Sequence, residues 1–315
     1  MKFTHIFCSL LCMLLFTQCS KEDSAVAPTP EKTPDYYIAN KPQPTDVDTL
    51  RILAFGNSYT QDANRYMADI CRDAGLDPQC VAIYYCAKNS YSLRQWWRTC
   101  TQNENITLTC SFGEYPIRIS GTVREVMRQP WDIIVFQQFS EHSTDFSTYN
   151  PYLHKLDSVA RAECTNPEMC VAWNTAWNYA RSYQIPGSSA RYEQICQAAR
   201  NVVERNGIDV VIPTGTAIEN ARHTSLQDDH DLTRDGTHLS FSVGCYVAAC
   251  TWYEKLVAPA FGKPVATTKF VYTVPSSMQQ HSQYPVRDMT LEMNPLCQRC
   301  AIEAIRNPYA VTKIE

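Results

Sequence analysis

The sequence has little of what nucleic-acid-binding or nucleotide-binding proteins require. Its 315 residues carry a net charge of −4 and no long basic run. Phosphate neutralisation needs clustered Lys and Arg, so nucleic acid is not an expected partner. The strand-to-helix turn at residues 56–60 holds one glycine, which is too few for a P-loop or a dinucleotide fingerprint. No internal repeat is visible either.

The N-terminus has the features of an export signal and not of a folded domain. Met1-Lys2 begins a short positive region, and the apolar stretch Ile6–Phe16 is too short to span a membrane. Cys19 follows in a pattern that resembles a bacterial lipoprotein signal, and Ser20–Asp23 resembles the charged export tag of Bacteroides-type lipoproteins. We therefore expect residues 1–19 to be a signal peptide and the protein to be an outer-membrane lipoprotein, held to the membrane only through lipidated Cys19. A plain secretory signal is the alternative.

Cysteine usage is consistent with export. Of 15 cysteines, Cys8 and Cys12 lie in the signal and Cys19 is the expected lipid anchor, which leaves 15 − 3 = 12. An even number in an oxidising compartment predicts several disulfides, with local candidates at Cys100/Cys110, Cys164/Cys170 and Cys297/Cys300 and the connectivity left open. The CxxC at Cys297–Cys300 has no second pair at suitable spacing, so it does not predict a zinc site.

The rest of the chain divides into a tether and one α/β domain. Residues 20–46 are polar and proline-rich, which predicts a semi-extended tether. Residues 47–315 form the expected domain, with a less regular C-terminal extension from about residue 260. Short apolar runs there alternate with helix-like stretches, so we expect about five strands in a parallel sheet covered on both faces. The expected strands are 50–55, 81–85, 133–136, 170–173 and 209–213. The expected helices are 63–74, 152–162, 192–205, 241–256 and 296–306.

The first candidate for chemistry is Ser58, in the turn that follows the first expected strand. Gly56 permits a tight turn, and Ser58 then stands near a helix N-terminus, where the helix dipole and free amides favour a developing anion. Ligands in parallel sheets bind beyond the carboxyl ends of the strands, which gives this position weight. The alternative interpretation is that Ser58 only caps the helix.

The second candidate is the turn formed by residues 235–240, before the last long helix of the sheet region. Asp235 and His238 are three residues apart, so both side chains can point into one site. A histidine base needs an orienting acceptor on its second nitrogen, and a serine needs such a base to act as a nucleophile. Alternatively, Asp235 caps the turn and His238 is packed or exposed.

Together the two motifs resemble the first and last sequence blocks of the SGNH (GDSL-like) hydrolases. The chain is most similar to an uncharacterised branch of that superfamily common in Bacteroides. The resemblance covers about residues 50–256 and continues weakly to the end. Four stretches carry it: Gly56-Asn57-Ser58-Tyr59-Thr60, Ile134-Val135-Phe136-Gln137-Gln138, Pro213-Thr214-Gly215-Thr216-Ala217-Ile218, and Leu232-Thr233-Arg234-Asp235-Gly236-Thr237-His238-Leu239-Ser240.

The resemblance implies a three-layer α/β/α sandwich of flavodoxin-like type and a Ser-His-Asp hydrolase that acts on esters. The resemblance implies that Ser58 is the nucleophile and that His238 is the general base and then the general acid. It also implies that Asp235 fixes the imidazole and stabilises its cation. No metal and no organic cofactor are expected.

The expected oxyanion hole departs from the family pattern. The superfamily uses the N–H of the nucleophile, here Ser58, together with a glycine N–H and an asparagine side chain. After the second strand no glycine occurs, so the backbone of Asn89 or Ser90 is the candidate. After the third strand Gln137 replaces the asparagine, with Gln138 in reserve, because a glutamine amide donates the same hydrogen bond from a longer arm. Alternatively, Gln137 is a satisfied polar residue at a strand end.

Further polar and aromatic residues fall where a substrate could lie. Aromatic faces beside amide groups would suit a sugar, and an arginine would hold an anionic group. The alternative is packing in the core or at its rim. The expected substrate-binding residues are Asn57, Gln138, His142, Trp173, Asn174 and Arg234.

These features favour a surface or periplasmic esterase that removes acyl groups such as acetyl from glycans, with a small acyl ester or an acylated glycan as its substrate. A second hypothesis from another class is a carbohydrate-binding or accessory lipoprotein on a hydrolase fold whose catalysis has decayed. A lipid esterase or thioesterase is the third. The oligomeric state stays open.

Overall fold

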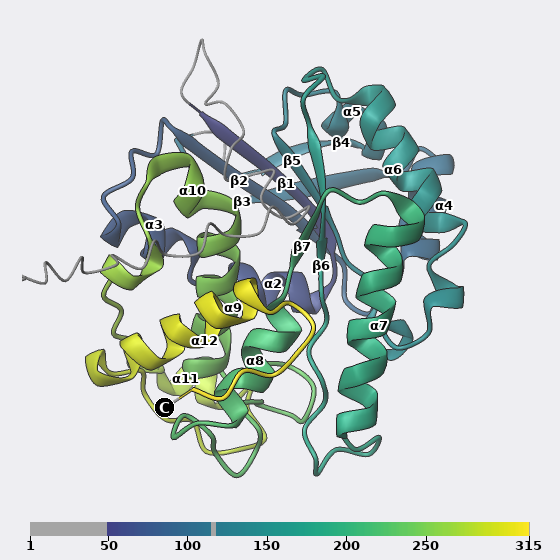
Figure 1. Ribbon diagram of the computed structural model, residues 1–315. Coiled ribbons are helices and arrows are strands. Elements are labelled where there is room, and N and C mark those ends of the chain that lie inside the picture. The colour runs from purple at the N-terminus through teal and green to yellow at the C-terminus, as the bar shows by residue number, and fades with distance from the viewer. Residues whose placement is uncertain (1–48, 115–117, 315) are drawn as a thin grey trace, which may run out of the picture. The chain divides into compact units, whose positions relative to one another are not determined.

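The computed structural model describes residues 49–114 and 118–314 (Figure 1). The predicted signal peptide, the lipidation site Cys19 and the tether at residues 20–46 lie outside these residues and stay predictions. Across the described part of the chain, no helix combines the length and apolarity needed to cross a membrane.

Seven strands form one sheet in the order β4-β3-β2-β1-β5-β6-β7. Five pair in parallel: β1 (Leu50–Gly56), β2 (Val81–Ala87), β5 (Ile133–Phe136), β6 (Cys170–Asn174) and β7 (Val210–Ile212). The sheet continues at one edge with two antiparallel strands, β3 (Asn105–Phe112) and β4 (Arg118–Thr122). The predicted α/β class and its five parallel strands are confirmed, and the antiparallel edge is an addition that the sequence pattern did not predict.

Helices cover both faces of the sheet (Figure 1). One layer holds α4 (Leu93–Thr101), α5 (Val123–Met127), α6 (Tyr152–Glu163) and α7 (Ser189–Asn206). The other holds α2 (Ser58–Asn64), α3 (Met67–Asp73), α8 (Thr214–Arg222), α9 (Val243–Trp252), α10 (Ala258–Phe261), α11 (Ser276–Gln279) and α12 (Asn294–Arg306). Short 3₁₀ turns occur at Ser140–His142, Phe146–Thr148, Val265–Thr267 and Leu291–Met293, and a π-helical turn spans Tyr253–Val257.

The strands read as continuous apolar runs because both of their faces are buried. Successive side chains of a strand point to opposite faces of the sheet. In β1, Ile52 and Ala54 pack with the α2 and α9 layer, whereas Leu53 and Phe55 pack with the α4 to α7 layer. Each buried strand therefore contributes to two cores, one on each side of the sheet.

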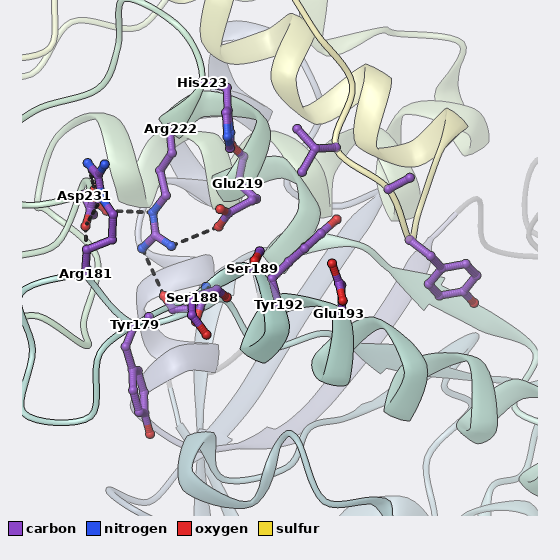
Figure 2. Close-up of a pocket in the computed structure, with 15 residues that line it drawn as sticks. Tyr179, Arg181, Ser188, Ser189, Tyr192, Glu193, Glu219, Arg222, His223 and Asp231 are labelled. Carbon is purple, nitrogen blue, oxygen red and sulfur yellow. Dashed lines mark hydrogen bonds and ion pairs between the residues drawn. The ribbon is translucent and has the colours of Figure 1, made fainter.

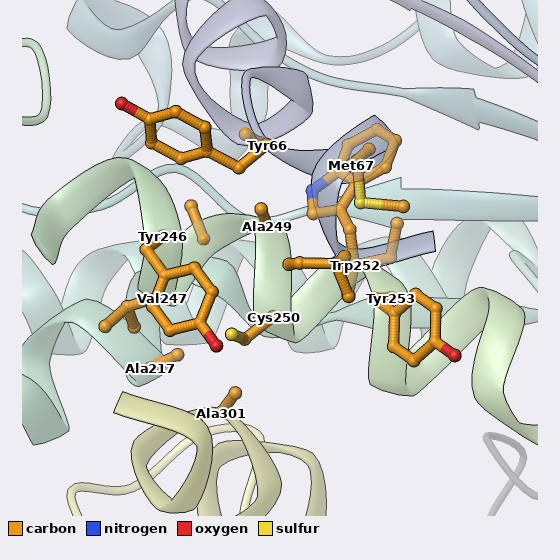
Figure 3. Close-up of a cluster of buried hydrophobic side chains, with 14 of the residues drawn as sticks. Tyr66, Met67, Ala217, Tyr246, Val247, Ala249, Cys250, Trp252, Tyr253 and Ala301 are labelled. Carbon is orange, nitrogen blue, oxygen red and sulfur yellow. The ribbon is translucent and has the colours of Figure 1, made fainter. Parts of the chain in front are cut away.

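Helix α9 is the centre of the larger core (Figure 3). Every residue from Val243 to Trp252 is buried, because the helix lies between the sheet, α2, α8 and α12. Ala301 of α12 packs in the same cluster as Val247 and Cys250 (Figure 3). The C-terminal extension thus completes the core of the domain.

The first expected helix, at residues 63–74, differs in the structure. The helix begins earlier, at Ser58, and it is interrupted between α2 and α3. The earlier start has a local cause, because the Asn57 side chain accepts a hydrogen bond from the Tyr59 N–H at 3.1 Å and so caps the helix. Ser58 is consequently the first residue of α2, directly after β1.

The predicted local disulfides are contradicted. Cys100, Cys110, Cys297 and Cys300 are free thiols. Both members of the CxxC on α12 face the apolar core, and burial raises the pKa of Cys300 to about 12. In the other candidate pair, Cys164 and Cys170 each donate a hydrogen bond from sulfur to a backbone carbonyl. These side chains serve as small apolar packing groups.

Candidate active site

The turn between β1 and α2 presents Ser58 at the carboxyl end of the sheet. A side chain at Gly56 would place its Cβ 1.8 Å from Thr60 Oγ1, so this turn requires glycine. Asn57 is buried, and its Nδ2 donates to the carbonyls of Tyr91 and Gln138, each at 3.1 Å. Because both ends of its amide are used, Asn57 holds the turn in place and has no free amide group for the predicted contact with substrate. Ser58 itself is partly exposed.

The loop between α8 and α9 brings the predicted base and acid to Ser58. His238 Nε2 lies 2.9 Å from Ser58 Oγ, and His238 Nδ1 lies 2.7 Å from Asp235 Oδ2. The His238 and Asp235 side chains keep 29% and 23% of their surface exposed, so the site is open to a substrate. The structure therefore joins the three predicted catalytic side chains into one continuous hydrogen-bonded chain.

The environment of Asp235 keeps it ionised. Burial raises the pKa of this carboxyl group, but hydrogen bonds from the His238 ring and from the His238 and Thr237 backbone N–H groups lower it more, and the pKa falls well below its usual range. A carboxylate can only accept, so Nδ1 of His238 carries the proton. Nε2 is then free to accept the proton of the Ser58 hydroxyl.

A segment after β6 braces the loop that carries the acid and base. Trp177 donates from Nε1 to the Thr237 carbonyl at 2.7 Å and stacks on Tyr59, with ring centroids 3.7 Å apart. The Ala180 N–H donates to the Gly236 carbonyl at 2.8 Å. Trp177 is fully buried, so it supports the acid–base loop from inside the protein and offers no ring face to a ligand.

The C-terminal extension contacts the same loop from another side. The Gln283 N–H and the Ser282 hydroxyl both donate to the Arg234 carbonyl, at 2.7 and 3.2 Å. Arg234 was predicted to bind an anionic part of the substrate. Its guanidinium instead contacts Asp62 of α2 at 2.9 Å and lies 4.5 Å from the centroid of the Phe241 ring. The guanidinium therefore binds groups inside the protein.

The two candidate glutamines of the oxyanion hole differ in their environments. Gln137 Oε1 accepts a hydrogen bond from Thr60 Oγ1 at 2.5 Å, while its Nε2 is buried and has no partner among the described residues. Gln138 is saturated, because its Oε1 accepts from the Leu93 and Phe139 N–H groups and its Nε2 donates to Thr148. Gln138 therefore links α4 to the β5 loop and has no amide group left for a substrate, whereas the Nε2 donor of Gln137 is unpaired among the described residues.

The backbone candidates Asn89 and Ser90 lie in an exposed turn after β2. The turn is closed by the hydrogen bond from the Tyr91 N–H to the Lys88 carbonyl at 3.1 Å, and Asn57 ties it to the nucleophile by bonding the Tyr91 carbonyl. Ser90 has a φ of 57°, a left-handed conformation that favours glycine. The backbone here thus has the conformation expected of a glycine, although the residue is serine.

Two further predicted substrate residues are buried away from the site. Trp173 is 2% exposed and packs against Tyr149 in the core on the α4 to α7 side. Asn174 is 0% exposed, and its Oδ1 accepts hydrogen bonds from Thr214 and Trp252. Both side chains are enclosed because β6 is covered on its two faces, which places them away from the predicted contact with substrate. His142 is exposed beside Phe139, and its role stays a prediction.

A cavity of 590 Å³ lies apart from this site, between α7, α8 and residues 309–311 (Figure 2). Its wall contains an ion network in which Arg222 donates to Glu219 at 3.1 Å and to the Asp231 carbonyl at 3.0 Å. Asp231 also pairs with Arg181 at 2.7 Å. A second cavity, of 270 Å³, lies beside Arg65 and Tyr85. Neither cavity is lined by Ser58, His238 or Asp235.

Metal ligation has no candidate site in residues 49–114 and 118–314. No group of three or more His, Cys, Asp or Glu side chains gathers there as a metal would require. The chemistry that the described residues support is nucleophilic, with a hydroxyl, a base in hydrogen-bond contact with it, and a carboxylate that orients the base.

Sequence reasoning missed Asp62. It lies one helical turn after Ser58 and contacts the acid–base loop through Arg234 and the Leu239 N–H. The signal was available, because a helix that begins at Ser58 places residue 62 on the same face as the nucleophile. Because the expected helix started at residue 63, the sequence pattern did not place Asp62 and Ser58 on one helix.

Comparisons with known proteins agree with the fold. Residues 51–283 match the model of a family described as "Domain of unknown function (DUF4886)". A DUF4886 family protein from Bacteroides uniformis, solved by crystallography, is 25% identical with a TM-score of 0.69, and the match covers 84% of this chain and 98% of that chain. LAE5, described as an alpha/beta hydrolase enzyme from the metagenome of Lake Arreo in Spain, is 12% identical with a TM-score of 0.46, covering 66% and 94% of the two chains.

A GDSL-like lipase from Bacteroides thetaiotaomicron is also 12% identical, with a TM-score of 0.39, and the match covers 69% of this chain and 92% of that chain. No curated protein matches the sequence. The TM-scores of LAE5 and the GDSL-like lipase are too low to transfer an activity to this chain, so the SGNH relationship stays a prediction.

Proposed function

This chain belongs to the DUF4886 family, and from the geometry of its site we propose that it is a serine hydrolase acting on carboxylic esters. One observation carries the proposal. Ser58 Oγ, the two ring nitrogens of His238 and the Asp235 carboxylate form an unbroken hydrogen-bonded chain, with contacts of 2.9 and 2.7 Å. Such a chain converts an ordinary hydroxyl into a nucleophile at neutral pH.

The proposed reaction proceeds through an acyl-enzyme. Ser58 Oγ attacks the ester carbonyl while His238 Nε2 takes its proton, and Asp235 stabilises the imidazolium that forms. His238 then returns the proton to the leaving alcohol. Water then attacks the acyl carbon while His238 Nε2 takes its proton, and His238 returns that proton to Ser58 Oγ as the Ser58–acyl bond breaks and the carboxylic acid leaves. The Ser58 N–H at the start of α2, the Ser90 N–H and the Gln137 amide are the proposed donors to the oxyanion.

We propose acetylated glycans as the substrate class. The His238 and Asp235 side chains are 29% and 23% exposed, and this open position favours a short acyl group on a large alcohol over a long acyl chain that needs a deep apolar pocket. The N-terminal sequence supports an exported outer-membrane lipoprotein, an address at which such glycans occur. The alternative of a binding protein with decayed catalysis is disfavoured by the complete triad.

The proposal is tested by labelling and by turnover. We expect a fluorophosphonate probe to modify the purified protein on Ser58, as located by peptide mass spectrometry. We also expect p-nitrophenyl acetate to be hydrolysed faster than p-nitrophenyl palmitate, and acetylated xylan to release acetate. A folded protein that takes up no probe and hydrolyses no acetyl ester would contradict the hydrolase proposal. Faster cleavage of the palmitate ester would contradict only the substrate class.

The role of Gln137 gives a separate prediction. If its Nε2 donates to the oxyanion, Gln137→Ala should lower kcat by about 10²- to 10³-fold with little change in KM, because the bond forms only in the transition state. Thr60→Val serves as the comparison, since it removes the hydrogen bond to Gln137 Oε1 and leaves the donor in place. Equal losses in the two variants would assign Gln137 a structural role alone. Steady-state kinetics on p-nitrophenyl acetate decides between them.

A further inference from the structure

The nucleophile and its base come from distant parts of the chain, and a buried ion pair connects those parts directly. Ser58 and His238 are 180 positions apart. Asp62 lies one turn after Ser58 on α2, with a side chain that is 1% exposed. Arg234, which directly precedes Asp235, places its Nη1 3.0 and 2.9 Å from the two Asp62 oxygens.

The same carboxylate holds the far end of the acid–base turn as well. Asp62 Oδ2 accepts the Leu239 N–H at 3.0 Å, and Arg234 Nη1 also donates to the Leu239 carbonyl at 2.6 Å. The turn is closed internally by the hydrogen bond from the Arg234 N–H to the His238 carbonyl at 2.9 Å. Residues 234 and 239, which flank Asp235 and His238, are therefore both fixed to one side chain of the nucleophile helix.

The ion pair is enclosed by the protein. Arg234 keeps only 13% of its side chain exposed and packs over the Phe241 ring. Burial lowers the pKa of Arg234, but Asp62, Cys245 and Asp235 together raise it above its usual range, so the guanidinium remains protonated. Each charge is shielded from water by the protein, and removing one partner would leave the other buried without compensation.

We propose that Asp62 and Arg234 are positioning residues, whose ion pair sets the separation between Ser58 Oγ and His238 Nε2. This inference rests on the proposed function of the triad. An error of about 1 Å in the placement of a catalytic group can lower the rate about 10²-fold. A contact that fixes both ends of the acid–base turn to the nucleophile helix acts on that distance directly.

The first test is Asp62→Asn, which keeps the shape of the side chain and removes its charge. We expect kcat on p-nitrophenyl acetate to fall about 10²-fold with KM within about 3-fold. The matched control is Asp157→Asn on α6. Asp157 is also a buried aspartate, paired with Arg161 at 2.8 Å, and it belongs to the opposite helix layer. Its loss should destabilise the fold without lowering kcat.

A second variant separates positioning from stability. Asp62→Leu combined with Arg234→Met replaces the pair by apolar groups, and such replacements often restore or increase stability. If the pair only stabilises the fold, this double variant regains wild-type kcat. We expect it to regain thermal stability and to keep the roughly 10²-fold loss in kcat. A crystal structure of Asp62→Asn should show Ser58 Oγ and His238 Nε2 beyond hydrogen-bond reach.

The outcomes that overturn the inference differ from those that overturn the function. Wild-type kcat in folded Asp62→Asn, or its recovery in the apolar double variant, would show that the pair only stabilises the fold. If the wild-type protein has no turnover that depends on Ser58, the proposed function fails instead. The Ser58–His238 distance in crystals of Asp62→Asn still tests the positioning in that case, and an unchanged distance would refute it.

Discussion

Replacing Ser58 with alanine is expected to lower kcat for ester hydrolysis by about 10⁶-fold. The variant removes the proposed nucleophile and leaves His238 without the hydroxyl that it contacts at 2.9 Å. Any activity that remains comes from the oxyanion donors and substrate binding acting on water. The change deletes one partly exposed hydroxyl group, so the melting temperature should stay close to that of the wild type. Burst-phase and steady-state assays with p-nitrophenyl acetate measure the loss.

Two further variants make the Ser58 result specific. His238→Ala should lose about as much activity, and combining both changes should add little, because the residues of a triad act as a unit. Ser158→Ala, at an exposed serine on α6 whose hydroxyl only donates to the His154 carbonyl, should keep full activity. Turnover that survives in Ser58→Ala would assign the hydrolysis to another group and remove the basis of the proposed mechanism.

Asp235→Asn is expected to lower kcat by about 10⁴-fold while the overall geometry of the site is kept. The carboxylate accepts the Nδ1 proton of His238 at 2.7 Å, and an amide nitrogen turned toward the same ring would donate to Nδ1 instead. The proton would then sit on Nε2, which could no longer accept from Ser58. Kinetics at pH 7 measure the loss, and Asp157→Asn on the other helix layer is the control. An active Asp235→Asn variant would show that His238 needs no orienting carboxylate.

The pH dependence of stability gives this variant a second readout. Hydrogen bonds that outweigh burial hold the pKa of Asp235 well below its usual range. A depressed carboxyl pKa contributes stability that is present above the unfolded pKa, about 3.9, and is lost as the pH falls through the folded value. Wild type should therefore exceed Asp235→Asn in free energy of unfolding at pH 7, with a gap that narrows below about pH 4. Urea titrations at several pH values measure this gap, and a gap independent of pH would contradict the assignment.

The central strands were predictable because they are buried on both faces. β5 contains only apolar residues, and its observed range, Ile133–Phe136, equals the predicted one. The antiparallel edge was missed because its residues alternate in burial. In β3, Ile106 and Leu108 face the core, while Asn105 and Thr107 are exposed, which leaves no continuous apolar run to detect.

The triad was predictable for a different reason. Asp235 and His238 share one turn, so their mutual geometry is local and their motif is specific. The supporting residues were not predictable, since polarity at a strand end is equally compatible with substrate binding and with internal hydrogen bonding. Gln138 and the Oδ1 of Asn174 form internal hydrogen bonds, and only their partners across the fold show this.

The contact between the C-terminal extension and the acid–base loop has a consequence for the order in which the site is made. The last strand of the sheet ends at Ile212, and His238 follows soon after it along the chain. The two donors to the Arg234 carbonyl, Ser282 and Gln283, come later, and α12, which covers α9, comes later still. A nascent chain leaves the ribosome N-terminus first. The nucleophile is thus synthesised well before the segments that support the loop carrying its acid and base.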